Sequence, residues 1–201
     1  MEFSTEQGKN GKINIYTDGE FRFAVSAFTR YSFPFSDGDE ITEEQLAEIK
    51  AASDRAKAYE SALRHLTARA HGEKELYQKL RMKYGPEAAR QAVDRCRQAG
   101  LTDDASFAAD LAEELSSRKG YAPERIKAEL IYRGIDKGIA ENAAEALDID
   151  RDSGIIKLLE KMKITDDSPD KDKARAVRRL LNAGYKIGEI RRHLSSETEQ
   201  F

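Results

Sequence analysis

The sequence lacks tryptophan altogether and holds only one cysteine, four prolines and three histidines among its 201 residues. A single cysteine excludes a framework of intrachain disulfides. No run approaches the roughly 18 consecutive apolar residues that a membrane-spanning helix requires. The N-terminal stretch is polar and lacks the apolar segment of a signal peptide. These absences predict a cytoplasmic protein.

Residue sets typical of active sites are also missing. The histidines His65, His71 and His193 are scattered and have no cysteine or carboxylate at metal-ligand spacing. There is no G-x-S-x-G, no phosphate-binding glycine loop and no H-E-x-x-H. We therefore predict that the protein is not an enzyme and has neither a metal site nor a cofactor.

Two features of the sequence have both a chemical and a structural interpretation. Asp103 and Asp104 could form a metal or acid–base pair, but adjacent helical residues point about 100° apart. First-turn aspartates suit the helix dipole, so capping is the better interpretation. Cys96 shares a helical face with Ala92 and Val93, which favours a buried small side chain over a reactive thiol.

What the chain does contain is a series of short amphipathic helices. Charged residues make up 35% and hydrophobic residues 39%, with a mean hydropathy of −0.71. Such a lean composition is normal for helical repeats, where each thin layer buries only a strip of apolar surface. Gly72, Gly85 and Gly100 divide the stretch 69–108 into helices, and Leu76 and Leu80 mark one apolar face.

Residues that commonly cap helices mark where several of these helices begin. We expect a capping box at Thr42 and Gln45, Pro86 and Pro123 as first helical residues, and caps at Thr102, Asp136 and Ser168, the last followed by Pro169. The helix that begins after Thr42 should end near Gly72, and a later helix should cover 174–183.

The helix around Leu80 recurs twice at intervals of 50 residues. Leu80 corresponds to Leu130 and then to Leu180, and the residues that precede each copy also repeat an apolar pattern. Self-similarity at this period predicts a repeat architecture. We expect three tandem three-helix repeats, resembling helix-turn-helix units, that form an elongated curved array in a mainly α protein.

The first 41 residues have a different periodicity. Apolar residues alternate on both sides of Asp18-Gly19, which is a strong signal for a β-hairpin with a type I′ turn. Residues 1–10 are polar and should be frayed. Six of the eight phenylalanines precede residue 36. They should pack between the hairpin and the first helices, although base stacking on nucleic acid is an alternative.

These patterns divide the chain into five segments. We assign a β-hairpin and aromatic segment to 1–41, helical repeats to 42–100, 101–148 and 149–195, and a disordered tail to 196–201.

Three motifs in the repeats resemble the RecX family of regulatory proteins. One is E-L-x-x-K-L at 75–80, preceded by Arg69. The second is G-L-x-D-D-x-x-F-A at 100–108, and the third joins Arg118-Lys119-Gly120 to Ile126, Leu130, Gly134 and Ile135. They occur in the family's order and spacing, and the resemblance covers about 58–195. It is weakest in the N-terminal hairpin and in repeat three.

The resemblance implies a binding function. Proteins of this family bind the RecA recombinase filament on single-stranded DNA, lie in its groove, and inhibit ATP hydrolysis, strand exchange and filament growth. They thereby modulate recombination and DNA repair. The partner implied for this chain is the RecA filament, with weak direct DNA binding as a further possibility and a monomer as the expected state.

Charge is unevenly distributed along the chain. Net charges are −4 for residues 1–57, +4 for 58–98, −6 for 99–150 and +3 for 151–201. The basic segments either form a surface that steers a charged partner or are ordinary solvated helix faces. Our candidate partner-binding residues are the basic side chains Arg64, Arg69, Lys79, Lys83, Arg125, Lys127, Arg133, Arg178, Arg179, Arg191 and Arg192.

Two other functions fit the same sequence. A sequence-independent DNA-binding repeat protein would use these side chains on phosphates, although the pI of about 5.8 is low for that class. The other alternative is a helical scaffold that binds an unrelated protein partner.

Overall fold

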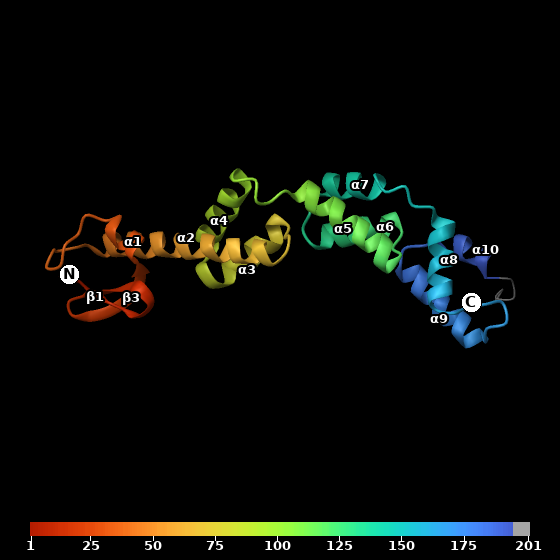
Figure 1. The fold of residues 1–201 in the computed structure, drawn as a ribbon, viewed down its shortest axis with the longest axis horizontal. Coiled ribbons are helices and arrows are strands. Elements are labelled where there is room, and N and C mark those ends of the chain that lie inside the picture. The colour runs from red at the N-terminus through yellow and green to blue at the C-terminus, as the bar shows by residue number, and fades with distance from the viewer. Residues whose placement is uncertain (195–201) are drawn as a thin grey trace. The chain divides into compact units, whose positions relative to one another are not determined.

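The computed structural model describes residues 1–194 of the chain (Figure 1). Two compact units divide it: Met1–His71 with Glu75–Thr102, and Gly72–Lys74 with the residues from Asp103 onward. None of the helices in the described part is long and apolar enough to cross a membrane. The disordered tail expected at 196–201 lies outside the described residues.

The first unit begins with a three-stranded antiparallel sheet in the order β1-β2-β3, formed by Phe3–Gln7, Lys12–Thr17 and Glu20–Ser26. Asp18 and Gly19 both have positive φ, at 51° and 77°, which confirms the predicted hairpin turn between β2 and β3.

The expectation that residues 1–10 are frayed is wrong. The segment 3–7 pairs with β2, with Phe3 opposite Thr17, and the Phe3 side chain is buried. Only a short 3-10 turn at Lys9–Gly11 separates the two strands. The polar run that follows Phe3 has no apolar alternation, so the strand is evident only from its partner.

The sheet packs on the start of the long helix, as expected. Ile13, Ile15 and Val25 form one core with Ile41, Leu46 and Ile49. Lys57 donates from Nζ to the carbonyl oxygen of Ala24 at 2.9 Å, and burial there lowers the pKa of its ammonium. The sheet and helix are therefore joined by both apolar and polar contacts.

The aromatic residues divide between core and surface. Phe3, Phe23, Phe33 and Phe35 belong to the core or pack against it, as predicted. By contrast, Phe21 on β3 and Phe28 and Tyr31 on the short helix α1 (Ala27–Tyr31) are exposed. The core-packing prediction is wrong for these three, whose side chains are 57%, 82% and 74% exposed.

Three helices complete the first unit: α2, α3 and α4, at Glu43–Ala68, Glu73–Tyr84 and Pro86–Gln98. The capping box of Thr42 and Gln45 is present, and Pro86 is the first residue of α4. The core contains Ala58 and Ala62 of α2, Leu76 and Leu80 of α3, and the small residues of α4 including Cys96. The expected end of α2 near Gly72 is four residues too late, because Arg69 already has an extended backbone.

The second unit contains two more three-helix repeats. Helices α5, α6 and α7 are Asp104–Lys119, Pro123–Tyr132 and Lys137–Glu145, and α8, α9 and α10 are Arg151–Lys161, Asp170–Asn182 and Ile187–His193. Each triplet has its own apolar core. Leu80, Leu130 and Leu180 are all fully buried, which confirms the register of the repeats.

Two helix starts differ from the prediction by one residue. Asp103, rather than Thr102, caps α5: its carboxylate accepts the N–H of Ala105 at 2.9 Å, while Thr102 is buried. Ser168 does not cap α9, because its hydroxyl accepts the N–H of Thr165 and closes the preceding turn. Helix α9 therefore follows Pro169 and begins at Asp170, one residue later than a cap at Ser168 predicts and four residues earlier than the expected range 174–183.

Candidate functional site

A basic groove lies in the second unit, between the end of α5 and helices α6, α8 and α9. Its volume is about 890 Å³, and no carboxylate is among the described residues that line it. Leu158, Met162 and Ala183 supply apolar surface, and Tyr121 and Asn182 also contribute. Six basic side chains line it: Lys119, Arg125, Lys161, Arg175, Arg178 and Arg179.

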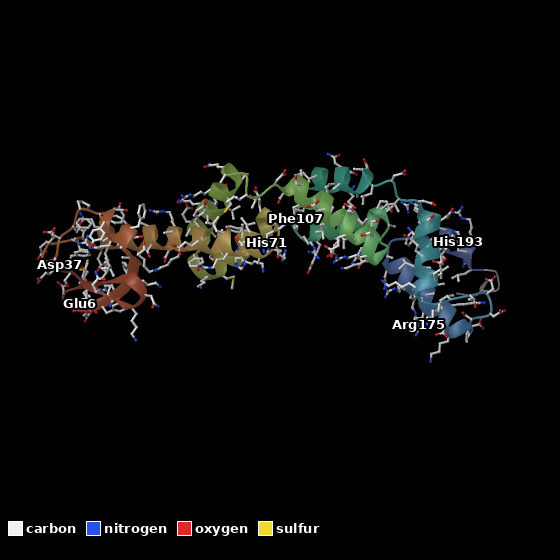
Figure 2. All side chains as sticks on the ribbon, in the orientation of Figure 1. Glu6, Asp37, His71, Phe107, Arg175 and His193 are labelled. Carbon is white, nitrogen blue, oxygen red and sulfur yellow. The ribbon has the colours of Figure 1, made fainter. Side chains whose placement is uncertain are left out.

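Helix α9 supplies half of the groove's positive charge because of its helical spacing. Arg175, Arg178 and Arg179 lie at positions i, i+3 and i+4, so they share a face. Ala176 and Leu180 on the other face are buried in the core of the third repeat. Figure 2 shows Arg175 on this helix. The same amphipathic pattern that folds α9 thus directs its arginines outward.

The walls of the groove meet where α6 begins and α9 ends. The N–H of Ala122 donates to the carbonyl oxygen of Ala183 at 2.8 Å. Gly184 has a φ of +94°, and a Cβ there would lie 2.8 Å from Cβ of Arg125. Only glycine allows this approach, because it combines positive φ with the absence of a side chain.

A second glycine brings α5 against α8. Gly120 ends α5 with a φ of +66°, and a Cβ there would lie 2.9 Å from Cγ of Leu158. This close approach places Lys119 next to the groove floor. Two glycines therefore position basic residues that lie far apart in the sequence.

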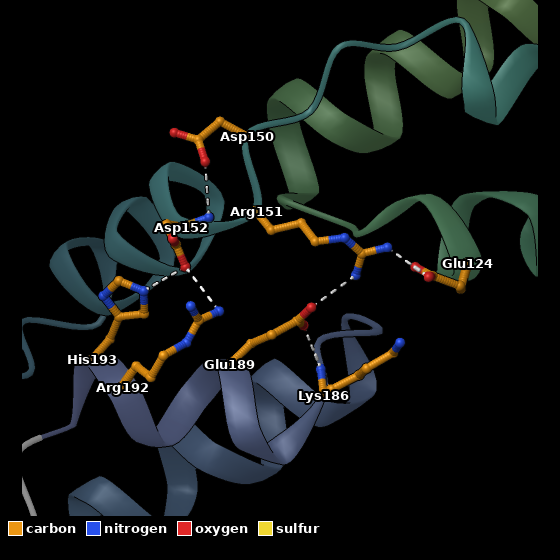
Figure 3. Close-up of polar contacts among 8 residues, drawn as sticks. All are labelled: Glu124, Asp150, Arg151, Asp152, Lys186, Glu189, Arg192 and His193. Carbon is orange, nitrogen blue, oxygen red and sulfur yellow. Dashed lines mark hydrogen bonds and ion pairs between the residues drawn. The ribbon is translucent and has the colours of Figure 1, made fainter.

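An ion-pair network joins α6, α8 and α10 close to these walls (Figure 3). Arg151 at the start of α8 donates to Glu124 of α6 at 2.5 Å and to Glu189 of α10 at 3.5 Å. Its neighbour Asp152 lies 2.8 Å from Nε2 of His193 and 3.6 Å from Arg192. The network thereby joins α8 to α10 within the third repeat and α8 to α6 of the second repeat.

The network lowers the pKa of Glu124. Burial alone would raise the pKa of this carboxyl, but the hydrogen bond and charge of Arg151 outweigh it and lower the pKa below its ordinary value. The same hydrogen bond raises the pKa of Arg151. The pair is therefore fully charged at neutral pH.

Most of the positive charge in the groove is not neutralised. Arg125 has Glu129 at 3.8 Å and Arg175 has Asp172 at 3.4 Å. For Arg178 and Arg179, the part of the chain that the structure describes provides no carboxylate within 4.0 Å. Lys119 and Arg125 lie 5.4 and 5.5 Å from the ring centroid of Tyr121. Such a surface suits an anionic group.

Three of the residues proposed from the sequence, Arg125, Arg178 and Arg179, come together in this groove. Arg191 and Arg192 are on α10, outside the groove lining. Lys127 of α6 forms an ion pair with Glu141, and Arg133, the residue after α6, forms one with Glu129.

The remaining four candidates are in the first unit. Arg69 and Lys79 both pair with Glu75, at 2.5 and 3.9 Å, and Lys83 lies over the ring of Tyr84. Arg64 is exposed on α2. Their role as partner contacts stays a prediction.

Three further basic residues line the groove that were not predicted from the sequence: Lys119, Lys161 and Arg175. Arg175 could have been found from its helical spacing to Arg178 and Arg179. Lys119 belongs to a motif already noted, just before the glycine that ends α5. No local sequence pattern indicates that Lys161 lines the groove, because its position depends on how α8 packs against the other helices.

The residues with a possible chemical role have structural roles instead. Asp103 caps α5, and Asp104 accepts the N–H of Glu73 at 2.8 Å. Cys96 is fully buried, as predicted, and burial raises the pKa of its thiol. Within residues 1–194, no group of three or more His, Cys, Asp and Glu side chains could hold a metal ion.

Fold and site together define a helical-repeat protein with a basic groove in its second unit. Family models match two segments: the first three-helix domain of RecX at residues 58–96 and the second at residues 103–143. The two segments correspond to the repeats that contain α2–α4 and α5–α7.

Several named relatives support the same family. The "Regulatory protein RecX" of Caldanaerobacter subterraneus subsp. tengcongensis is 31% identical over 140 residues, covering 69% of this chain and 71% of the relative. That of Levilactobacillus brevis is 30% identical over 130 residues, covering 64% of this chain but 49% of the relative. The chain therefore belongs to the RecX family, and it spans about half the length of some relatives.

Solved structures agree with the fold. "Crystal structure of regulatory protein RecX" aligns with a TM-score of 0.64 at 23% identity, covering 94% of this chain and 96% of that one. RecX from Lactobacillus salivarius aligns with a TM-score of 0.57 at 25% identity, covering 69% and 93%.

Proposed function

We propose that this protein regulates the RecA recombinase in the cytoplasm. It binds as a monomer to the RecA filament on single-stranded DNA and inhibits ATP hydrolysis, strand exchange and filament growth. It thereby modulates recombination and DNA repair. The observation that carries this proposal is membership of the RecX family, whose named relatives are regulatory proteins. The inhibition acts through binding, without catalysis by the protein itself.

The basic groove supports binding to a charged partner. Arginine holds carboxylates and phosphates through several hydrogen bonds in a fixed geometry, and Arg178 and Arg179 are available for this. Because the groove is open to solvent, its attraction for a partner should weaken with salt over the range where the Debye length falls below about 10 Å.

ATP hydrolysis by RecA on single-stranded DNA, titrated with this protein, tests the proposal. Inhibition at far fewer protein chains than RecA-covered DNA sites, with little direct DNA binding in a parallel gel shift, is the expected result. A hydrolysis rate that stays constant through equimolar protein would contradict the proposed function.

A charge-reversal variant tests whether the groove contributes to the inhibition of RecA. Arg178→Glu/Arg179→Glu should raise the concentration for half-inhibition at least about tenfold, since each reversal replaces attraction by repulsion. Lys9→Glu/Lys137→Glu is the matched control: it makes the same charge change at two exposed lysines outside the groove lining. Equal loss in both variants would mean that overall charge, rather than the groove, drives inhibition.

Sequence-independent DNA binding is the second candidate function, and the same groove favours it. It requires a steep fall of affinity with salt, with a slope set by the number of phosphates contacted. The low pI and the net charge of −3 weigh against it. Tight, salt-sensitive binding to DNA without any effect on RecA would select this function instead.

A further inference from the structure

We propose that the basic groove holds a short acidic segment of the protein partner that also carries apolar side chains. Carboxylates of this segment bind Arg178 and Arg179, and an apolar side chain rests on the partly buried Met162, next to the buried Leu158. This proposal rests on the proposed function, because it specifies the chemistry of the partner that the same site recognises.

The positive charge of the groove predicts a negatively charged ligand. Six cationic side chains surround a space of about 890 Å³, and only Arg125 and Arg175 have a carboxylate within 4.0 Å among the residues described. A ligand with several carboxylates would pair these charges, and arginine binds carboxylates in a bidentate geometry. The volume is within the range of pockets that hold a small molecule or a few side chains.

The floor of the groove distinguishes a protein segment from a nucleic acid. Proteins that bind single strands stack the bases on open aromatic faces. Among the described residues that line the groove, Tyr121 is the one aromatic residue, and Lys119 and Arg125 already lie over its ring. Leu158, Met162 and Ala183 are aliphatic, so they suit the aliphatic side chains of a peptide better than a base.

The surroundings of the groove limit the length of an anionic ligand. Residues 99–150, which contribute Lys119 and Arg125 to the groove, have 12 acidic and 6 basic side chains. A long polyanion that extended from the groove over the surface of residues 99–150 would meet this excess of negative charge. A short acidic segment can place its charges inside the groove and avoid the repulsion.

The groove is also formed before any ligand binds. The backbone hydrogen bond from Ala122 to Ala183, the close approach at Gly184 and the ion pair of Arg151 with Glu124 all join its walls. A preformed site spares the ligand much of the cost of ordering the groove.

Fluorescence anisotropy with the full chain tests the ligand class. The probes are a labelled peptide of about 12 residues, roughly three helical turns, that alternates glutamates with leucines, a peptide in which serine replaces leucine, and an oligothymidylate of about 12 nucleotides. We expect the glutamate–leucine peptide to bind most tightly. Arg178→Glu/Arg179→Glu should weaken it at least about tenfold, while Lys9→Glu/Lys137→Glu changes it by less than about twofold.

Three results would overturn the proposal. The first is that the glutamate–leucine peptide shows no saturable binding, and the second is that it binds equally to the groove variant and to the unchanged protein. Alternatively, the oligothymidylate binds more tightly than either peptide and loses this affinity in the groove variant, which would identify the groove as a nucleic-acid site.

Photo-crosslinking to RecA filaments then separates this proposal from the proposed function. Asn182 lines the groove and is exposed, so p-benzoylphenylalanine at this position should crosslink to a filament segment rich in Asp and Glu. A crosslink to DNA or to a segment without acidic residues contradicts the groove proposal. If the full chain does not bind RecA but still binds the glutamate–leucine peptide, only the proposed function fails.

Discussion

Gly184 shows how one residue decides the geometry of the groove. It has positive φ, and its missing side chain lets α6 approach the end of α9, with Arg125 on the other side of the contact. The sequence alone does not distinguish such a glycine from one that can be replaced. Gly188, only four residues later, has open space around it.

Gly184→Ala should therefore destabilise the protein by about 1–3 kcal/mol, since it adds a clash to an unfavourable left-handed conformation. Urea denaturation measures the change in the free energy of unfolding. The control is Gly188→Ala in α10, which should leave stability unchanged or raise it by up to about 1 kcal/mol. Equal effects of the two substitutions would rule out the close approach at Gly184.

At the scale of secondary-structure elements, the network around Arg151 joins three helices that are distant in the sequence. The side chains of Arg151, Glu124 and Glu189 are 29%, 56% and 17% exposed, so solvent screens part of the attraction. Its main consequence is then the arrangement of α6, α8 and α10 rather than a large share of stability.

A double-mutant cycle with Arg151→Met and Glu124→Gln measures this coupling in the free energy of unfolding. We expect about 0.5–1 kcal/mol at neutral pH, as for other partly exposed pairs. Because the pKa of Glu124 is lowered on folding, the coupling is complete above the ordinary carboxyl pKa of about 4.3 and decreases as pH falls through the folded-state pKa. Coupling that is absent at pH 7, or that grows on acidification, would contradict the ion pair.

At the scale of the whole molecule, the chain consists of a small sheet and three helix triplets, each with a core of its own. Stability in such proteins is approximately the sum of local contributions from the repeats and from the contacts between neighbours. A change in one core should therefore have its greatest effect locally.

Leu130→Ala should cost about 2–5 kcal/mol, because the side chain is fully buried in the core of α5–α7. Hydrogen exchange followed by mass spectrometry should show faster exchange in α5–α7, with α2–α4 in the first unit little changed. Ile131→Ala, at a neighbouring residue that is 40% exposed, is the control and should change stability by less than about 0.5 kcal/mol. Uniform acceleration along the chain would instead mean that the repeats unfold as a single unit.

The helical repeats could be predicted because their signals are local. Leu80, Leu130 and Leu180 recur at one interval, and Thr42, Asp136 and Pro86 mark helix starts by simple capping chemistry. The error at Thr102 arose because the adjacent Asp103 supplies the cap, and the error at Ser168 arose because its hydroxyl closes the preceding turn instead. Strand β1 was missed because a strand with a polar sequence is stabilised by its partner rather than by its own pattern.

The sequence by itself determined the helical class, the period of the repeats and the hairpin, because these follow from periodicity, turn chemistry and helix caps within a few residues. Only the tertiary structure decided which basic residues act together. Lys119, Lys161 and Arg179 come from three different helices. Their convergence depends on the approach of α5 and α6 to α8 and α9, and that approach is set by packing between segments far apart in the chain.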